Sequence, residues 1–124
     1  MKYRLLMMMV TLLLSGSCRP VEEGFTVTLS EFRIEATMTR LPASETQIQV
    51  VNEGDFPHTL VVNEVEGRVL GATGLLMPGE TTKLTFDPSE GRLMFTCRIV
   101  TEIEGGQIID HYQEGMVAAL EVDE

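Results

Sequence analysis

The sequence predicts an all-β domain, an antiparallel sandwich or barrel, and two patterns along its 124 residues support this. Several short runs alternate apolar and polar residues with a period of two, which is typical of strands that present one face to a core. Clusters of Gly, Pro, Asp and Asn separate these runs about every eight to twelve residues. No run has the apolar spacing of an amphipathic helix, so we expect seven or more short strands.

The expected strands follow one another from Phe25 to Val122. Positions 25, 27 and 29 are apolar and alternate with hydroxyl residues, so the first strand begins at Phe25. The even-numbered positions from Phe32 to Met38 continue this alternation until Pro42 interrupts it at a turn. The remaining β-rich runs span residues 46–52, 58–63, 81–86, 92–97 and 116–122.

The N-terminal residues have the pattern of an export signal. Two basic residues, Lys2 and Arg4, precede an apolar run of ten residues at 5–14, and three small residues follow it. This order is typical of a signal peptide, which we predict over residues 1–17. A helix that spans a bilayer needs about 20 apolar residues, so the run is too short for a permanent membrane anchor.

Cys18 directly follows the expected signal peptide. The segment 14–18, LSGSC, resembles a bacterial lipoprotein signal, which predicts cleavage before Cys18 and its acylation. The alternative is ordinary signal-peptidase cleavage after Ser17 or a little later. Either route exports the protein to the periplasm or cell envelope, and acylation would anchor it to the membrane. Residues 18–24 then form a linker and residues 25–124 one domain, because about 100 residues suffice for a single core.

The net charge argues against nucleic-acid binding, and the cysteine content points to a chemical role for Cys97. The formal net charge is −10, whereas nucleic-acid binding depends on clustered Lys and Arg. We therefore expect that the chain does not bind nucleic acid. A basic or neutral protein is the more plausible partner. Cys97 is the only cysteine in the expected domain. A lone thiol in an oxidising compartment indicates metal binding or catalytic chemistry.

Four residues of the domain form a donor set that suits copper. His58, Cys97 and Met116 each share the phase of apolar neighbours, so we expect their side chains to point toward the core from strand ends. With His111 they supply two imidazoles, one thiolate and one thioether, a set that accommodates both Cu(I) and Cu(II). Zinc sites recruit further Cys or His residues, so copper is the expected metal.

Four short segments, taken together, point to one known family. They are NEGDFPHTLVV at 52–62, MPGET at 77–81, FTC at 95–97 and HYQEGM at 111–116. In this order they resemble the first-histidine strand, the Pro-Gly-Glu turn, the thiolate segment and the closing histidine-to-methionine segment of cupredoxins. This family includes plastocyanin, azurin and sulfocyanin, and the resemblance runs from about residue 25 to 122.

The resemblance implies both a fold and a function. The fold is a Greek-key antiparallel β-sandwich of about seven to eight strands. The function is that of a mononuclear type 1, or blue, copper protein that carries single electrons between redox partners outside the cytoplasm. It would hold one copper ion through His58, Cys97, His111 and Met116.

One departure from the family concerns the segment between Cys97 and His111. Cupredoxins usually place only a few residues there, whereas this chain has thirteen. Residues 98–102 and 107–110 are β-prone arms around a Gly-Gly turn, so we expect a hairpin that returns His111 to the side of Cys97. In this family the second histidine usually lies near the surface where electrons enter and leave. Four acidic residues lie near His111 in the sequence and could therefore orient a basic redox partner. They are Glu102, Glu104, Asp110 and Glu114.

Two other functions remain open. The same ligands could capture and deliver copper, or the domain could be a metal-free interaction module in which the four residues are core packing. An enzyme is not expected, because multicopper oxidases and copper nitrite reductases need further histidines and this chain has only two. We also expect no small-molecule substrate, because an electron carrier binds and transforms none.

Overall fold

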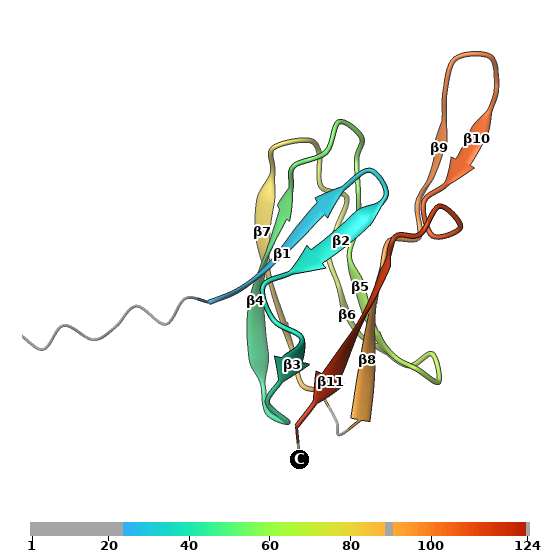
Figure 1. Cartoon of the computed structure of the whole chain (residues 1–124). Helices are drawn as coiled ribbons and strands as arrows, with labels where there is room; N and C mark the ends of the chain where they lie inside the picture. The colour runs from blue at the N-terminus through green and yellow to red at the C-terminus, as the bar shows by residue number, and fades with distance from the viewer. Residues whose placement is uncertain (1–23, 89–90, 124) are drawn as a thin grey trace, which may run out of the picture.

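Two β-sheets pack face to face in the computed structural model, which describes residues 24–88 and 91–123 (Figure 1). The predicted signal peptide and Cys18 lie outside the described residues. The first sheet has the order β2(Arg33–Ala36), β1(Phe25–Ser30), β4(Thr46–Asn52), β7(Thr81–Phe86). The second has the order β3(Arg40–Leu41), β11(Val117–Val122), β8(Gly91–Thr96), β5(Val61–Glu64), β6(Val69–Ala72). The described residues contain no helix long and apolar enough to cross a bilayer.

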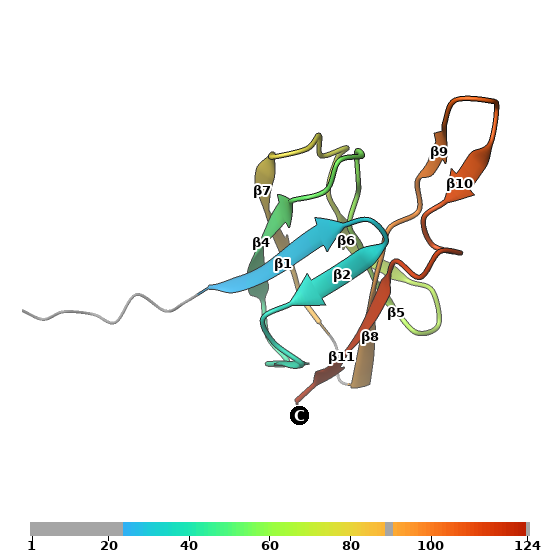
Figure 2. The same cartoon turned by 45° about the horizontal axis from the view of Figure 1, so that its top comes forward.

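A separate two-stranded hairpin, β9(Val100–Glu102) and β10(Ile108–Asp110), projects beyond the end of the sandwich in both views (Figure 1, Figure 2). It lies between β8 and β11 in the sequence, so its base sits where these two neighbouring strands meet. The predicted hairpin is therefore confirmed.

The sandwich is confirmed, but its sheets are mixed where the sequence led us to expect antiparallel ones. β1 pairs in parallel with β4, and β3 pairs in parallel with β11. A parallel pair needs a connection that crosses over, because a tight hairpin can join only antiparallel strands. For the pair of β1 and β4, this connection consists of β2 and β3. The chain passes to the second sheet at β3 and returns to the first sheet at β4.

The core lies between the sheets and follows the alternation read from the sequence. Val27 and Leu29 of β1, Val50 of β4, and Leu93 and Phe95 of β8 are buried. Burying a side chain of this kind stabilises the fold by about 1.5–3 kcal/mol each. The same core continues without a break to the hairpin end, where it includes Cys97 and Met116.

Candidate metal centre

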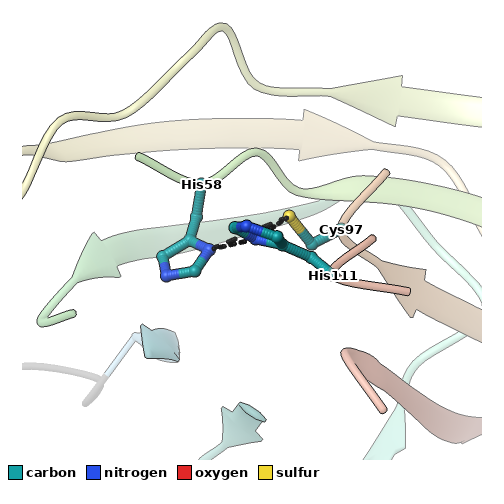
Figure 3. A group of neighbouring side chains, drawn as sticks. All are labelled: His58, Cys97 and His111. Atoms are coloured by element: carbon teal, nitrogen blue, oxygen red, sulfur yellow. Dashed lines mark hydrogen bonds between the residues drawn. The ribbon is translucent and has the colours of Figure 1, made fainter. Parts of the chain in front are cut away.

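Two histidines and one cysteine meet at the base of the hairpin (Figure 3). Nδ1 of His58 lies 3.1 Å from Nδ1 of His111, and Sγ of Cys97 lies 3.9 Å and 3.8 Å from these two nitrogens. All three side chains are completely buried. A point within their triangle is about 2.1 Å from each atom, close to the bonds of about 2.0–2.3 Å that imidazole and thiolate make to zinc-sized ions. The geometry therefore fits a single metal ion.

Cys97 and Met116 are held together by the ladder between β8 and β11. The backbone N–H of Cys97 donates to the carbonyl of Met116 at 3.2 Å, and the N–H of Met116 donates to the carbonyl of His111 at 3.0 Å. Met116 is fully buried, in agreement with the phase predicted for its side chain. The backbone of Met116 is thus bonded to those of Cys97 and His111. Its thioether remains a predicted ligand.

His111 reaches the site because the hairpin closes. The N–H of His111 donates to the carbonyl of Ile99 at 3.1 Å, which extends the pairing of β9 and β10 to the base of the hairpin. At the tip, Gly105 and Gly106 have φ of 91° and 76°, a backbone conformation that favours glycine. The thirteen intervening residues therefore return His111 to the side of Cys97.

His58 is fixed by a loop network around a buried amide. Its backbone pairs with Leu76 through two hydrogen bonds of 3.0 and 2.8 Å, although β5 begins only at Val61. The Asn52 side chain donates to the carbonyls of Phe56 and Leu76, both at 2.9 Å, and accepts from the N–H of Gly54 at 2.9 Å. Asn52 thereby ties the loop before His58 to the loop that pairs with it.

The Pro-Gly-Glu turn supports the same network. The N–H of Glu80 donates to the carbonyl of Met77 at 3.0 Å, and Gly79 has a φ of 83°. Pro before such a glycine is typical of a type II turn. The N–H of Gly79 then donates to the carbonyl of Asn52 at 2.8 Å, which joins the turn to the loop that carries His58.

Two side chains that no sequence pattern predicted contact the outer nitrogens of the histidines, Nε2 of His58 and Nε2 of His111. Oε1 of Glu31, in the turn between β1 and β2, lies 3.0 Å from Nε2 of His58. Oγ1 of Thr101, in β9, lies 2.7 Å from Nε2 of His111. Such partners fix which ring nitrogen is free to bind a metal. No motif marks them, since each contact depends on how separate strands meet.

The Glu31 carboxylate is held in its charged form. Partial burial raises its pKa, but hydrogen bonds from the N–H groups of Phe56 and Asp55 and from His58 outweigh this, and the pKa is about 2. Both N–H groups lie 2.8 Å from Oε1. The group beside His58 is therefore an anion at neutral pH.

The second histidine is not at the surface, contrary to the family expectation. His111 is completely buried, and the ring of Phe32 meets it edge-on at 5.2 Å while that of Phe56 is 6.4 Å away. These rings and Thr101 of the hairpin surround it. Burial is the largest cause that lowers the pKa of His111, which favours the neutral imidazole that a metal ion requires.

One of the four acidic residues near His111 has a structural role. The Asp110 carboxylate accepts hydrogen bonds from the N–H groups of Tyr112 and Gln113 at 3.0 and 3.2 Å. Asp110 thus caps the tight turn that runs from His111 to Met116. Glu102, Glu104 and Glu114 are exposed.

Comparison with known proteins identifies the fold. No protein-family model matches the chain, and no curated protein matches it in sequence. Reduced auracyanin from Roseiflexus castenholzii is 15% identical with a TM-score of 0.58, over 80% of this chain and 95% of auracyanin. An azurin from Methylomonas sp. strain J is 17% identical with a TM-score of 0.57, over 80% of this chain and 96% of the azurin. The chain therefore has the cupredoxin fold, as its four motifs implied.

The same fold also occurs as part of a larger protein. A multi-copper oxidase from Pediococcus acidilactici is 17% identical with a TM-score of 0.58, and the match covers 83% of this chain but only 27% of the oxidase. Small proteins and parts of enzymes therefore share this fold. The fold does not determine the function, which has to be inferred from the site.

Proposed function

We propose that this protein is a mononuclear type 1 copper protein that carries single electrons between protein partners outside the cytoplasm. The observation that carries the proposal is the buried triangle of His58 Nδ1, Cys97 Sγ and His111 Nδ1, whose size fits one ion. Two imidazoles and one thiolate are the trigonal set typical of blue copper, with Met116 as the weak axial ligand.

The setting of the ligands supports electron transfer over catalysis. Because the three ligand side chains have no exposed surface, no substrate can reach the ion, whereas an electron can pass through the protein. A site held by strands, loops and a capped turn also changes little between Cu(I) and Cu(II). Proteins of this fold change oxidation state, since auracyanin and rusticyanin have been solved in reduced form and an amicyanin variant in oxidised form.

The outer face of the hairpin is the surface where we place the redox partner. In the β9 and β10 register Thr101 pairs with Ile109 on the inner side, so Val100 and Ile108 lie on the outer side, 54% and 67% exposed. Glu102 shares that side. An apolar face with acidic neighbours, on a chain of net charge −10, suits a basic one-electron carrier protein. The electron would pass from His111 to the hairpin through Thr101.

The N-terminal segment completes the proposal. We propose that the signal at residues 1–17 exports the chain and that acylated Cys18 tethers it to the membrane of the cell envelope. The linker 18–24 would then separate the domain from the lipid surface.

Cupric ion added to the purified domain tests the function. We expect one copper per chain, an intense visible absorption from thiolate-to-copper charge transfer and the narrow-splitting electron paramagnetic resonance spectrum of blue copper. Cys97→Ser should abolish the colour because a hydroxyl is not a soft thiolate donor. Tight uptake of the ion without colour, or its ready loss to a chelator, would instead favour copper delivery. If the domain takes up no copper, the remaining hypothesis is that it is a metal-free interaction module.

A further inference from the structure

The orientation of His58 depends on the carboxylate of Glu31, in the turn between β1 and β2. An ionised carboxylate only accepts hydrogen bonds, so the 3.0 Å contact with Oε1 of Glu31 requires the proton of His58 to be on Nε2. Nδ1, which faces His111 and Cys97, then keeps its lone pair free for a metal. The contact therefore selects the tautomer that can bind.

Glu31 is itself fastened to the segment that carries His58. The same Oε1 accepts from the N–H groups of Asp55 and Phe56, both at 2.8 Å, and these residues precede His58 in the chain. The carboxylate, the loop and the imidazole are thus one hydrogen-bonded unit. His111 has no such charged partner, because its Nε2 meets the neutral hydroxyl of Thr101.

Gly54 provides the space for this carboxylate. A Cβ at position 54 would overlap Oε1 of Glu31 and would lie 2.9 Å from its Cδ. Gly54 is not among the glycines with positive φ, so its backbone suits any residue. The atoms that a methyl group would meet are the end of one flexible side chain. An alanine there would therefore expel the carboxylate and leave the backbone in place.

We propose that Glu31 is a positioning residue of the metal centre, seated in the space left by Gly54, that holds His58 in the Nε2–H form and lowers the reduction potential of the bound copper. The second part rests on the proposed function. A negative charge next to one ligand stabilises Cu(II) more than Cu(I), and outer partners of metal-bound histidines tune the metal in this way.

The tautomer is tested without copper. In ¹⁵N-labelled metal-free protein at pH 8 we expect His58 in the Nε2–H form, with an Nε2 proton that exchanges slowly with water. Glu31→Ala and Gly54→Ala should each lose this slow exchange. In the Glu31→Ala background, Gly54→Ala should add nothing, because the side chain that its methyl group would meet is gone. A proton on Nδ1 of His58 in the wild type, or unchanged exchange in both variants, overturns the positioning role.

The effect on the metal is tested by Glu31→Gln, which keeps an oxygen acceptor of the same shape and removes the charge. We expect the ratio of Cu(II) to Cu(I) affinity to fall about tenfold, which raises the potential by about 59 mV for one electron. The matched control is Glu53→Gln, which removes the same charge from an exposed side chain of the neighbouring loop and should shift the potential far less. Equal shifts in the two variants would overturn the tuning role.

The experiments distinguish failure of the proposed copper function from failure of the proposed role of Glu31. If the wild type takes up no copper, the proposed function is wrong, and the exchange of the His58 proton still decides whether Glu31 positions the ring. If copper binds and gives the blue spectrum while Glu31→Gln leaves the potential unchanged and Glu31→Ala leaves the proton exchange unchanged, only the role of Glu31 is wrong.

Discussion

The hydroxyl of Thr101 lies 2.7 Å from Nε2 of His111, so the hairpin inserted between Cys97 and His111 contacts the metal centre directly. Thr101 is half-buried, and its register partner Ile109 lies on the same side of the hairpin. The insertion is therefore more than a spacer, because it forms part of the wall around the second histidine.

Thr101→Val tests this contact. Valine has the same shape but no hydroxyl, so Nε2 of His111 would lose its hydrogen-bond partner. We expect copper affinity to fall about tenfold, measured by competition with a chelator, and electron self-exchange to slow. Thr82→Val, at a half-buried position of β7, should change neither quantity. Equal losses in both variants would argue against a specific role for Thr101.

The length of the hairpin should matter less than its base. Replacing residues 103–107 by Asn-Gly would join Glu102 directly to its register partner Ile108 through a tight turn, with Thr101 retained. The blue spectrum should survive. Removing residues 99–109 also deletes Thr101 and the Ile99 carbonyl that accepts from His111, so copper should then be held more weakly. Identical spectra and affinities for the two variants would contradict this reasoning.

His111 and Met116 should respond unequally to substitution. His111→Ala removes one corner of the trigonal set, so we expect weaker copper retention and an altered spectrum that external imidazole partly restores. Met116→Leu removes only the weak axial donor, so copper should stay while the potential rises as Cu(II) loses a donor. Spectroscopy and voltammetry measure both. An unchanged spectrum, affinity and potential in His111→Ala would refute the proposed ligand set.

Much of the sandwich was predictable because alternation is a local property. Val27 and Leu29 share one buried face as expected, and His58 keeps the phase of Leu60 although β5 starts only at Val61. Neither β3 nor β6 was predicted. The two residues of β3 are too few to show a period, and Gly71 interrupts any alternation in β6.

The three side chains that meet at the site, His58, Cys97 and His111, were predictable as metal-binding candidates from their chemistry, whereas the side chains that contact them were not. Histidine and cysteine are rare in this chain, which has two of each, so each of these residues stands out. Glu31 is one of many acidic residues, and its contact spans 27 positions between two sheets. Phe32 likewise has the pattern of a core residue, yet its ring packs on His111. Such contacts follow from how the β1–β2 turn meets both the loop before His58 and the segment at His111, which periodicity does not encode.

Copper should stabilise the folded domain. An ion that binds only the folded chain adds about 2.7 kcal/mol at 100 times its dissociation constant. Copper at this excess should therefore raise the thermal midpoint by roughly 10 °C or more, and a chelator should reverse the change. Calorimetry measures both. Cys97→Ser should show a much smaller shift, since it lacks the thiolate, and an equal shift would indicate that copper binds elsewhere.

The membrane tether is tested at Cys18. If Cys18 is acylated, the wild-type protein should partition with membranes in its native bacterial host, and Cys18→Ala should block this processing. The several acyl chains of a lipoprotein hold firmly, whereas one chain binds only marginally. Mass spectrometry of the mature N-terminus measures the outcome. A wholly soluble wild-type protein that begins after Ser17 or later without lipid would support ordinary cleavage.

The separation of the hairpin from the two sheets has an evolutionary consequence. Its outer residues, Val100 and Ile108, do not belong to the core, while its base is fixed by Ile99 and Thr101. Substitutions on the outer face can therefore accumulate without disturbing the ligands or the sandwich. Descendants of this chain would therefore be free to vary this face while the cluster of His58, Cys97 and His111 beneath it stayed unchanged.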